Sequence, residues 1–494
     1  MIEIRKNIVK KQTNFWNGCV FHPTDAVEDP WGRRILDKMA EDGAVKSVRL
    51  YAMLEDIVYL NEKNELCFDF RLSDLRLDYM VEKGYDLIIA YAGIPDCIAS
   101  STKIKTSVSK NKTRYKGKMW NGAPPRDYSL WEQVCYEYTR HIIERYGIDR
   151  VKEWRLQCFN EPDIGAFFLG NMNDGKEAVA IRCREYCKLY ESFAHGVSRA
   201  SLDVRIGGPA LAYHLDFLGG WLDFVKEKGL KLDFISAHHY GTGPNELNSG
   251  KDRFCVDGFL AHPKRVLEVI AERGLDHLPF VMDEWGMASH GFFNREECPA
   301  MMARETEVFA AYFVKLIYKI IESDIKMENL MICLSGQHEM VEDFSGFRNF
   351  FTLNFIKKPI YNAFILASRL GEGLISADVD SENVFVVPTK RRDGSYSVLL
   401  SYSNEFFDEN IPEIEEKLIF DENLSDKMIT VWCIDREHTN PYRLFEKLHK
   451  DTLDSEDIAF LRHEGHLEPI VTQCVGENIV LKLTANCTYL VEVE

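Results

Sequence analysis

The sequence has no long hydrophobic run, and this absence limits where the chain can act. No apolar stretch approaches the roughly 18 residues that a membrane-spanning helix requires. The first eleven residues, MIEIRKNIVKK, have neither the apolar core nor the small-residue cleavage site of a secretory signal peptide. We therefore expect a cytoplasmic protein without a membrane partner.

An excess of positive charge is also missing. The chain has 494 residues, of which 60 are Lys or Arg and 78 are Asp or Glu, so its formal net charge is −18. Proteins bind nucleic acids largely through basic surfaces, and an acidic chain is repelled by the phosphates. We expect no nucleic-acid partner and attribute the acidity to solubility.

The thirteen cysteines form neither a disulfide framework nor a metal-ligand pattern. Their number is odd, and several lie inside apolar segments, as buried free thiols do in a reducing compartment. The closest pair, Cys183 and Cys187, lies in a helical pattern and has no two further ligands nearby, which a zinc site would need. We expect no metal ion and no other cofactor.

Eight short apolar segments alternate with longer segments of helical periodicity. The apolar segments are rich in Val, Ile, Leu and Phe and alternate weakly, which is typical of parallel strands buried on both faces. The expected strands are 17–22, 46–51, 86–91, 153–159, 204–210, 233–238, 279–284 and 329–335. The expected helices are 31–42, 73–83, 131–146, 177–200, 214–228, 260–273, 299–322 and a segment that begins at Pro359. Eight strand–helix repeats predict an α/β fold, a (β/α)8 TIM barrel over residues 14–370.

The pattern changes after Gly371. Short β-type segments follow at 384–388, 397–401, 428–433 and 479–483. They predict that residues 371–494 form a smaller accessory all-β sandwich domain. The charged stretch 403–427 has no clear period, and we expect it to be loop and strand edge.

Two carboxylates stand at the ends of expected barrel strands. Glu161 follows the fourth strand, in Asn160-Glu161-Pro162, and Glu284 ends the seventh. The active site of a TIM barrel lies at this end of the strands, and strands four and seven lie across the barrel from each other. Retaining glycoside hydrolysis needs such a pair, one carboxyl to protonate the leaving oxygen and one to attack the anomeric carbon. The pattern favours this chemistry over two unrelated loop carboxylates.

Several neighbours of these strand ends are candidates for binding a sugar. Asn160 can donate a hydrogen bond to the sugar 2-hydroxyl, Tyr240 can hold the nucleophile, and Trp285 offers an apolar face. His22 ends the first strand and either contacts the sugar or has a structural role. The other candidates are His238, beside Tyr240, and the wall positions Tyr51 and Phe159.

An ordered series of motifs runs from about residue 14 to residue 370. It comprises Arg49-Leu50-Tyr51, PPRDY at 124–128, HIIERYG at 141–147, Asn160-Glu161-Pro162, GGPA at 207–210, DFIS at 233–236 with His238 and Tyr240, Glu284-Trp285 and Lys358-Pro359. In these motifs the chain resembles glycoside hydrolase family 39 of clan A, whose members include β-xylosidases and α-L-iduronidases.

The resemblance implies roles for three residues. Glu161 is the general acid/base, Glu284 is the nucleophile, and Arg49 hydrogen-bonds the nucleophile. It also implies that the N-terminal strand joins the accessory sandwich, so we assign residues 1–13 to that domain. A homo-oligomer is compatible with the resemblance.

The chain departs from the family pattern beside the catalytic pair. Tyr51 replaces a common His, Phe159 replaces a common Trp, and Asp283 precedes the nucleophile where Thr is common. We predict an exo-acting β-xylosidase-type enzyme on short oligosaccharides. The alternatives are an exo-glycosidase of another specificity (a β-glucosidase, a β-galactosidase or an α-L-iduronidase-like enzyme on an acidic sugar) and a non-catalytic sugar-binding protein.

Residues 101–118 hold seven basic residues and no acidic one. Because they follow the third expected strand, they belong at the active-site end of the barrel. This segment either attracts an acidic sugar or an acidic subunit, or it is a solvated loop.

Overall fold

The structure is a computed structural model of the whole chain. It describes all residues except 12, 22–26, 106–119, 250–253, 290–294, 335–339, 341, 406–410, 425–426, 451 and 475–478. His22 and most of the basic segment 101–118 therefore lie outside the described residues. In the part of the chain that is described, no helix is long and apolar enough to cross a membrane.

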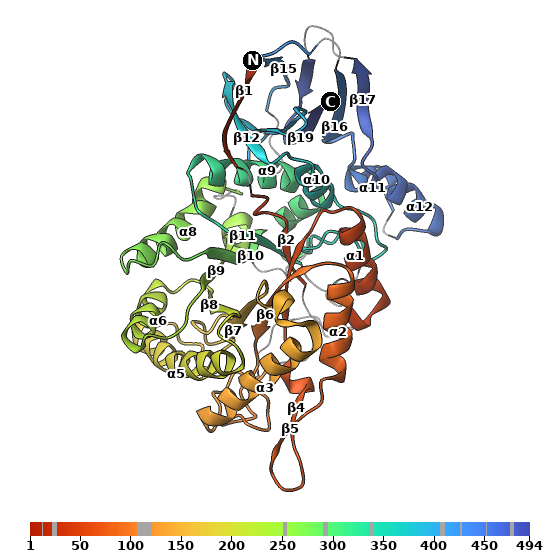
Figure 1. Cartoon of the computed structure of the whole chain (residues 1–494). Coiled ribbons are helices and arrows are strands. Elements are labelled where there is room, and N and C mark those ends of the chain that lie inside the picture. The colour runs from red at the N-terminus through yellow and green to blue at the C-terminus, as the bar shows by residue number, and fades with distance from the viewer. Residues whose placement is uncertain are drawn as a thin grey trace.

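Eight parallel strands close into a barrel, and helices surround it (Figure 1). In order around the barrel the strands are β2 (Gly18–Phe21), β3 (Ser47–Tyr51), β6 (Asp86–Tyr91), β7 (Arg155–Cys158), β8 (Arg205–Leu211), β9 (Phe234–Thr242), β10 (Phe280–Ala288) and β11 (Asn329–Leu334). β11 pairs with β2 and closes the circle. The predicted TIM barrel is confirmed, strand by strand and in sequence order.

The helices cover the outside of the barrel. They are α1 (Pro30–Glu41), α2 (Arg71–Glu82), α3 (Tyr128–Tyr146), α4 (Ile148–Val151), α5 (Lys176–Ala200), α6 (Leu215–Lys228), α7 (Pro244–Asn248), α8 (Val256–Ala271), α9 (Glu307–Glu322) and α10 (Pro359–Ser368). The expected helix 299–322 is divided into a 3-10 helix, Pro299–Glu305, and α9. Thr306 separates them because its backbone is extended and its side chain caps α9 by accepting from the Val308 N–H.

Side chains inside the barrel form a small apolar core below the strand ends. It contains Val20, Ile88, Phe234, Val281, Met331 and Cys333. The alternate residues of the same strands point outward into the large core between strands and helices. The barrel interior is therefore filled with apolar side chains at this level.

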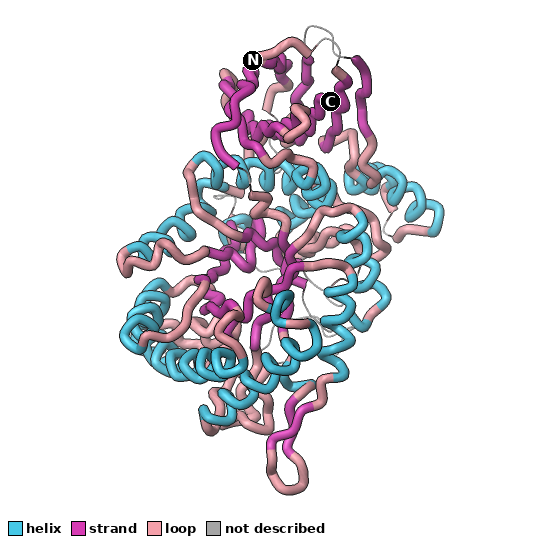
Figure 2. The backbone as a smooth tube through the Cα atoms, viewed as in Figure 1, coloured by secondary structure: helices cyan, strands magenta, loops and turns pink. Residues whose placement is uncertain are grey.

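The accessory domain is one continuous nine-stranded sheet, grouped apart from the barrel strands in Figure 2. β1 (Ile2–Lys11) pairs with β12 (Gly373–Val379) and β15 (Ile414–Phe420), so the N-terminal strand belongs to this sheet. The other strands are β13 (Val384–Lys390), β14 (Tyr396–Tyr402), β16 (Met428–Ile434), β17 (Pro469–Cys474), β18 (Ile479–Leu483) and β19 (Cys487–Val493). A mostly-β second domain is confirmed; its boundaries at 13/14 and 370/371 stay a prediction.

A separate antiparallel hairpin, β4 (Val58–Leu60) and β5 (Leu66–Phe68), projects from the barrel.

Two features of this domain differ from the prediction. The charged stretch 403–427 contains β15, an inner strand between β1 and β18 rather than an edge. Glu416 takes a buried position between the exposed Glu415 and Lys417, so the apolar alternation of a strand is hidden in the sequence. The helices α11 (Pro441–Leu448) and α12 (Ser455–Glu464), between β16 and β17, were not expected.

A buried ion pair fixes the segment 342–358, which leads from the end of β11 to α10. Lys358 Nζ lies 2.7 Å from Glu305 Oε1, and that oxygen also accepts a hydrogen bond of 2.7 Å from the Gly346 N–H. Both charged side chains are almost completely buried. Burial lowers the pKa of Lys358. The position of this segment thus depends on an ion pair that is shielded from water.

We expect Glu305→Gln to lower the free energy of unfolding by about 3 kcal/mol, because Lys358 would remain buried without its counter-ion. The midpoint of urea unfolding, followed by tryptophan fluorescence, measures the change. The matched control is Glu413→Gln, which removes the exposed partner of Lys482 and should change stability by less than about 0.5 kcal/mol. Equal losses in the two variants would contradict the importance of the buried pair.

Candidate active site

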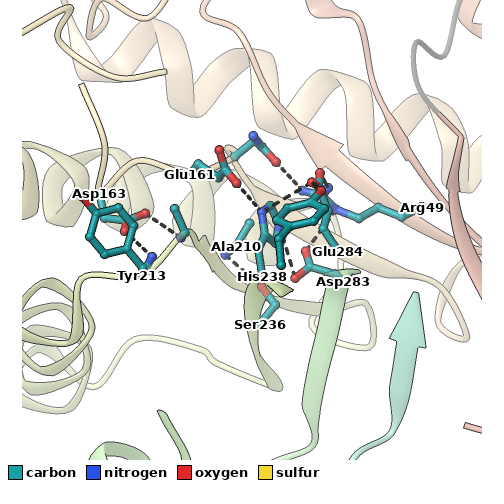
Figure 3. Close-up of polar contacts among 12 residues, drawn as sticks. Arg49, Glu161, Asp163, Ala210, Tyr213, Ser236, His238, Asp283 and Glu284 are labelled. Carbon is teal, nitrogen blue, oxygen red and sulfur yellow. Dashed lines mark hydrogen bonds and ion pairs between the residues drawn. The ribbon is translucent and has the colours of Figure 1, made fainter. Parts of the chain in front are cut away.

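The carboxylates of Glu161 and Glu284 meet at the C-terminal end of the barrel strands (Figure 3). Glu161 lies in the loop after β7, and Glu284 lies on β10. One carboxylate oxygen of each residue and a ring nitrogen of His238 lie within 4.8 Å of one another. The Glu161 side chain is 12% exposed and that of Glu284 is 9% exposed. The structure thus brings together the two carboxylates that the strand count singled out.

The loop that carries Glu161 has an unusual backbone. Phe159 and Glu161 have φ values of 65° and 46°, in the left-handed region that side-chain-bearing residues seldom adopt. Neighbouring strands hold this shape: the Phe159 N–H donates to the Tyr91 carbonyl and the Glu161 N–H to the Ala210 carbonyl, both at 3.1 Å. Such conformations persist where the surroundings impose them, and they are common at functional sites.

A β-bulge in β10 turns two consecutive carboxylates inward. The pairing of β10 with β9 shifts by one residue between Met282 and Glu284, so Asp283 is the extra residue. Met282 and Trp285 belong to the core on the helix side of the barrel. Asp283 and Glu284, in contrast, both bind groups at the barrel centre.

Arg49 of β3 is a fully buried cation that binds five side chains, one of them the Tyr51 hydroxyl, to which Nη1 donates at 3.2 Å. Its guanidinium lies 2.7 Å from Glu284 Oε1 and 3.0 Å from Asp283 Oδ2. It also donates to Asn160 Oδ1 at 2.7 Å and to Gln157 Oε1 at 2.9 Å. The expected hydrogen bond between Arg49 and Glu284 is present, and the same cation holds Asn160 beside Glu161.

Two tyrosines complete the surroundings of Glu284. The Tyr240 hydroxyl donates to Oε2 at 2.5 Å, and the Tyr51 hydroxyl donates to Oε1 at 3.1 Å. Arg348 in turn donates to the Tyr240 hydroxyl at 2.8 Å and brings a second cation near Glu284. The sequence did not single out Arg348, because it lies in the motif-poor segment 342–358.

The two carboxylates have opposite electrostatic surroundings. Burial raises the pKa of Glu161, although the hydrogen bond with His238 opposes this effect. Burial also acts to raise the pKa of Glu284. The nearby charges of His238, Arg49 and Arg348 overcome it and hold that pKa well below the usual range. One carboxyl is thus disposed to keep its proton and the other to stay ionised, as an acid and a nucleophile require.

The chain is similar to known proteins in sequence and in fold. The family model described as "Glycosyl hydrolases family 39" matches residues 1–466. The chain belongs to glycosyl hydrolases family 39. It is a glycoside hydrolase, in agreement with the relatives that it matches.

These relatives carry two different activity names. A β-xylosidase of Caldicellulosiruptor saccharolyticus is 26% identical over 388 residues, which cover 76% of this chain and 72% of that protein. An α-L-iduronidase of Mus musculus is 28% identical over 257 residues, which cover 46% of this chain and 35% of that protein. A solved monomeric β-xylosidase from Caulobacter crescentus CB15 shares the fold, with a TM-score of 0.81 at 17% identity over 100% of this chain and 99% of the other.

Two of the expected sugar-binding residues lie elsewhere. Trp285 is fully buried and stacks on Phe313 at 6.0 Å between ring centroids, on the helix side of the barrel. β10 continues past Glu284 to Ala288, so Trp285 is still in the strand and points to the opposite face from Glu284. Phe159 is also fully buried and packs on Phe168, because the left-handed turn directs it into the core. The prediction that these two rings face the sugar is corrected accordingly.

Another aromatic group lies beside Glu161 and Glu284. Trp120 packs edge-on against Tyr51, at 4.4 Å between ring centroids, and lies 6.1 Å from the ring of Phe167. Through Tyr51 this aromatic group is connected to Glu284. Trp120 follows the basic segment and lies outside any periodic pattern, so no motif or spacing marked it as a site residue.

Two clusters of described residues have the donor types of a metal site. They are Glu161, His238 and Glu284, and Cys433, Asp435 and His438. In the first, Arg49 already supplies a positive charge at Glu284. In the second, Asp435 accepts hydrogen bonds of 2.7 Å from the backbone N–H groups of Glu437 and His438 and closes a turn after β16. Protein contacts account for both clusters.

We expect Tyr240→Phe to move the acidic limb of the pH–rate profile to higher pH, by about one unit. The hydroxyl stabilises the ionised form of Glu284, so its loss raises the pKa of Glu284 and the pH above which that side chain is a carboxylate. The pH dependence of kcat/KM on an aryl glycoside measures the shift. The control is Tyr91→Phe, a buried tyrosine bound to Thr139, which should leave the limb in place. An unchanged limb in Tyr240→Phe would contradict this tuning.

Proposed function

We propose that the protein is a retaining exo-glycosidase that acts by double displacement, with Glu161 as general acid/base and Glu284 as nucleophile. The observation that carries the proposal is the close approach of two carboxylates, within 4.8 Å between oxygens, whose pKa values are shifted in opposite directions. Retaining enzymes hold their carboxyls about 5–5.5 Å apart, whereas inverting enzymes leave about 6.5–9.5 Å for a water. The short separation favours direct attack on the sugar.

In the first step Glu284 attacks the anomeric carbon while Glu161 gives its proton to the leaving oxygen. The bond from the anomeric carbon to that oxygen breaks, and a glycosyl ester forms at Glu284. Arg49 and Tyr240 orient the attacking carboxylate through its two oxygens. Asn160 presents its amide N–H groups to the sugar 2-hydroxyl, because Arg49 occupies its carbonyl oxygen.

In the second step water attacks the anomeric carbon. Glu161, now a carboxylate, takes the proton of that water, the ester bond breaks, and Glu284 leaves as a carboxylate. The hydroxyl of another sugar can replace water in this step, which gives transglycosylation. A non-catalytic sugar-binding protein would have no use for the opposite tuning of the two carboxylates.

We propose β-xylosides and short xylo-oligosaccharides as the substrates. Two relatives that match most of the chain are named β-xylosidase, at 26% and 25% identity. The aromatic group of Trp120, Tyr51 and Phe167 offers the apolar surface for a sugar ring that was first assigned to Trp285. We also propose a cytoplasmic location, since the cysteines whose side chains are described are all free thiols.

One observation favours an acidic sugar as the second candidate. Arg348 lies next to Tyr240 at the catalytic pair, and a guanidinium is suited to bind a carboxylate on the substrate. The basic segment 101–118 and the relatives named α-L-iduronidase also favour an acidic sugar.

We expect Glu161→Ala and Glu284→Ala each to lower kcat/KM on an alkyl glycoside by about a thousandfold. With a dinitrophenyl leaving group, which needs no protonation, Glu161→Ala should still release one equivalent of phenol in a burst and then turn over slowly. Azide should restore its turnover and give a glycosyl azide of retained configuration. Glu284→Ala should show no burst, and the surface control Glu413→Ala should match the native enzyme. A first product of inverted configuration, or full activity in both variants, would refute the roles.

A panel of 4-nitrophenyl glycosides identifies the sugar that the enzyme cleaves best. We expect the highest kcat/KM with the β-xyloside, compared with the β-glucoside, the β-galactoside and the α-L-iduronide. The acidic-sugar candidate predicts instead that the iduronide is cleaved best. It also predicts that Arg348→Ala raises the KM for the iduronide by more than about tenfold, the loss expected for one charge-assisted hydrogen bond. No release from the xyloside together with release from another sugar would replace the first candidate.

A further inference from the structure

Asp283, the second carboxylate of the β10 bulge, has no part in the steps described above. It is fully buried, and its Oδ2 accepts from Gln157 at 2.5 Å and lies 3.0 Å from Arg49 Nε. Its Oδ1 is also buried and has no hydrogen-bond partner among the described residues. That oxygen faces His238 Nε2 at 3.6 Å, and Nε2 likewise has no hydrogen-bond partner there (Figure 3).

His238 consequently lies among three carboxylates. Its Nδ1 is 2.7 Å from Glu161 Oε1 and 3.7 Å from Glu284 Oε2, while its Nε2 faces Asp283. The side chain is 1% exposed, so water does not compete for either nitrogen. Only the imidazolium carries N–H groups on both nitrogens and can donate to Glu161 Oε1 and Asp283 Oδ1 together.

The other titratable groups around this cluster come from β3, β9, β11, the segment 342–358 and the loop after β7, where the charge of Asp163 raises the pKa of Glu161. Burial raises the pKa of the Tyr51 and Tyr240 hydroxyls and raises the pKa of the Cys333 thiol to about 12, so all three stay neutral. The cations Arg49 and Arg348 act from the Glu284 side. Burial alone would lower the pKa of His238, but the surrounding carboxylates raise it to about 10.

Among the fully buried groups of this cluster, the charges balance only when His238 is protonated; Arg348, which also acts on Glu284, is only partly buried. Arg49 contributes one positive charge, and Asp283 contributes one negative charge that Arg49 compensates. The catalytic pair holds one further negative charge, on Glu284 before the first step and on Glu161 after it. Without a charge on His238 this second negative charge would have no fully buried counter-ion within the cluster, which is costly in a low-dielectric site.

We propose that Asp283 is a positioning residue that keeps His238 an imidazolium, and that this fixed cation stabilises whichever catalytic carboxylate is ionised. The inference rests on the proposed double displacement. In the first step the negative charge leaves Glu284, which becomes a neutral ester, and appears on Glu161, which has given its proton to the leaving group. The second step reverses this transfer. His238 faces both carboxylates and needs neither to move nor to lose its proton.

The test is Asp283→Asn, which keeps the shape of the side chain and removes its charge. Because a carboxylate beside an imidazolium raises the pKa of the ring, its removal lowers that pKa, and His238 then loses its proton at lower pH. We expect the alkaline limb of kcat/KM to move to lower pH by at least about one unit. We also expect kcat at neutral pH to fall about tenfold with a smaller change in KM.

Nitrogen-15 NMR of histidine-labelled enzyme reports the state of His238 without any substrate. The His238 signals are assigned by their loss in His238→Gln. We expect both ring nitrogens to be protonated at pH 8 in the native enzyme and the ring to be neutral at pH 8 in Asp283→Asn. A neutral His238 in the native enzyme at pH 8 would overturn the inference, and this measurement also decides the matter where Asp283→Asn does not fold.

Two controls separate this role from a loss of packing. Asp435→Asn changes a buried aspartate of the accessory domain that accepts backbone N–H groups, and it should leave the alkaline limb unmoved. In a His238→Gln background, Asp283→Asn should add little, because the two residues act as one unit. An unmoved limb in Asp283→Asn would overturn the inference. Failure of the proposed function would appear instead as unchanged activity in Glu161→Ala and Glu284→Ala.

Discussion

The buried guanidinium of Arg49 is the interaction on which the rest of the site depends. A cation without access to water is stable only where carboxylates compensate its charge and other acceptors fill its N–H groups. Asp283 and Glu284 supply the charge, and Asn160 and Gln157 supply the acceptors. Because the planar guanidinium of Arg49 binds several partners in fixed directions, this one side chain on β3 positions the end of β7 relative to β10. This bridge across the barrel holds Asn160, the neighbour of Glu161, in a fixed position relative to Glu284.

The same charges cause the difference in pKa between Glu161 and Glu284. Glu284 lies on the cationic side, near Arg49 and Arg348, and ionises readily, whereas burial dominates at Glu161. His238 lies between them and interacts with both. The backbone serves this arrangement at two places, the left-handed turn that presents Glu161 and the bulge that admits both Asp283 and Glu284 to the interior. These two local departures from regular structure thus present the three carboxylates to the barrel interior.

The barrel could be predicted because each strand is followed by a long segment of helical period, and counting strands placed Glu161 and Glu284 at one end. The rest of the site and of the accessory domain depended on features that leave no pattern in the sequence. The expected seventh strand ended at Glu284, but β10 runs on, and this extension turns Trp285 outward. Trp120 and Arg348 belong to long connections after the third and eighth strands, whose paths depend on tertiary contacts such as the Glu305–Lys358 pair. In the accessory domain, an inward-facing glutamate concealed β15.

The central claim is that Glu284 forms a covalent bond with the sugar. A 2-deoxy-2-fluoro glycoside of the preferred sugar, with a dinitrophenyl leaving group, slows the second step and lets the ester accumulate. Peptide mapping by mass spectrometry then locates the added mass. The account predicts one sugar per chain, on the peptide that contains Glu284. A label on the peptide of Glu161, or no label while the enzyme releases the inverted sugar from its normal substrate, would contradict it.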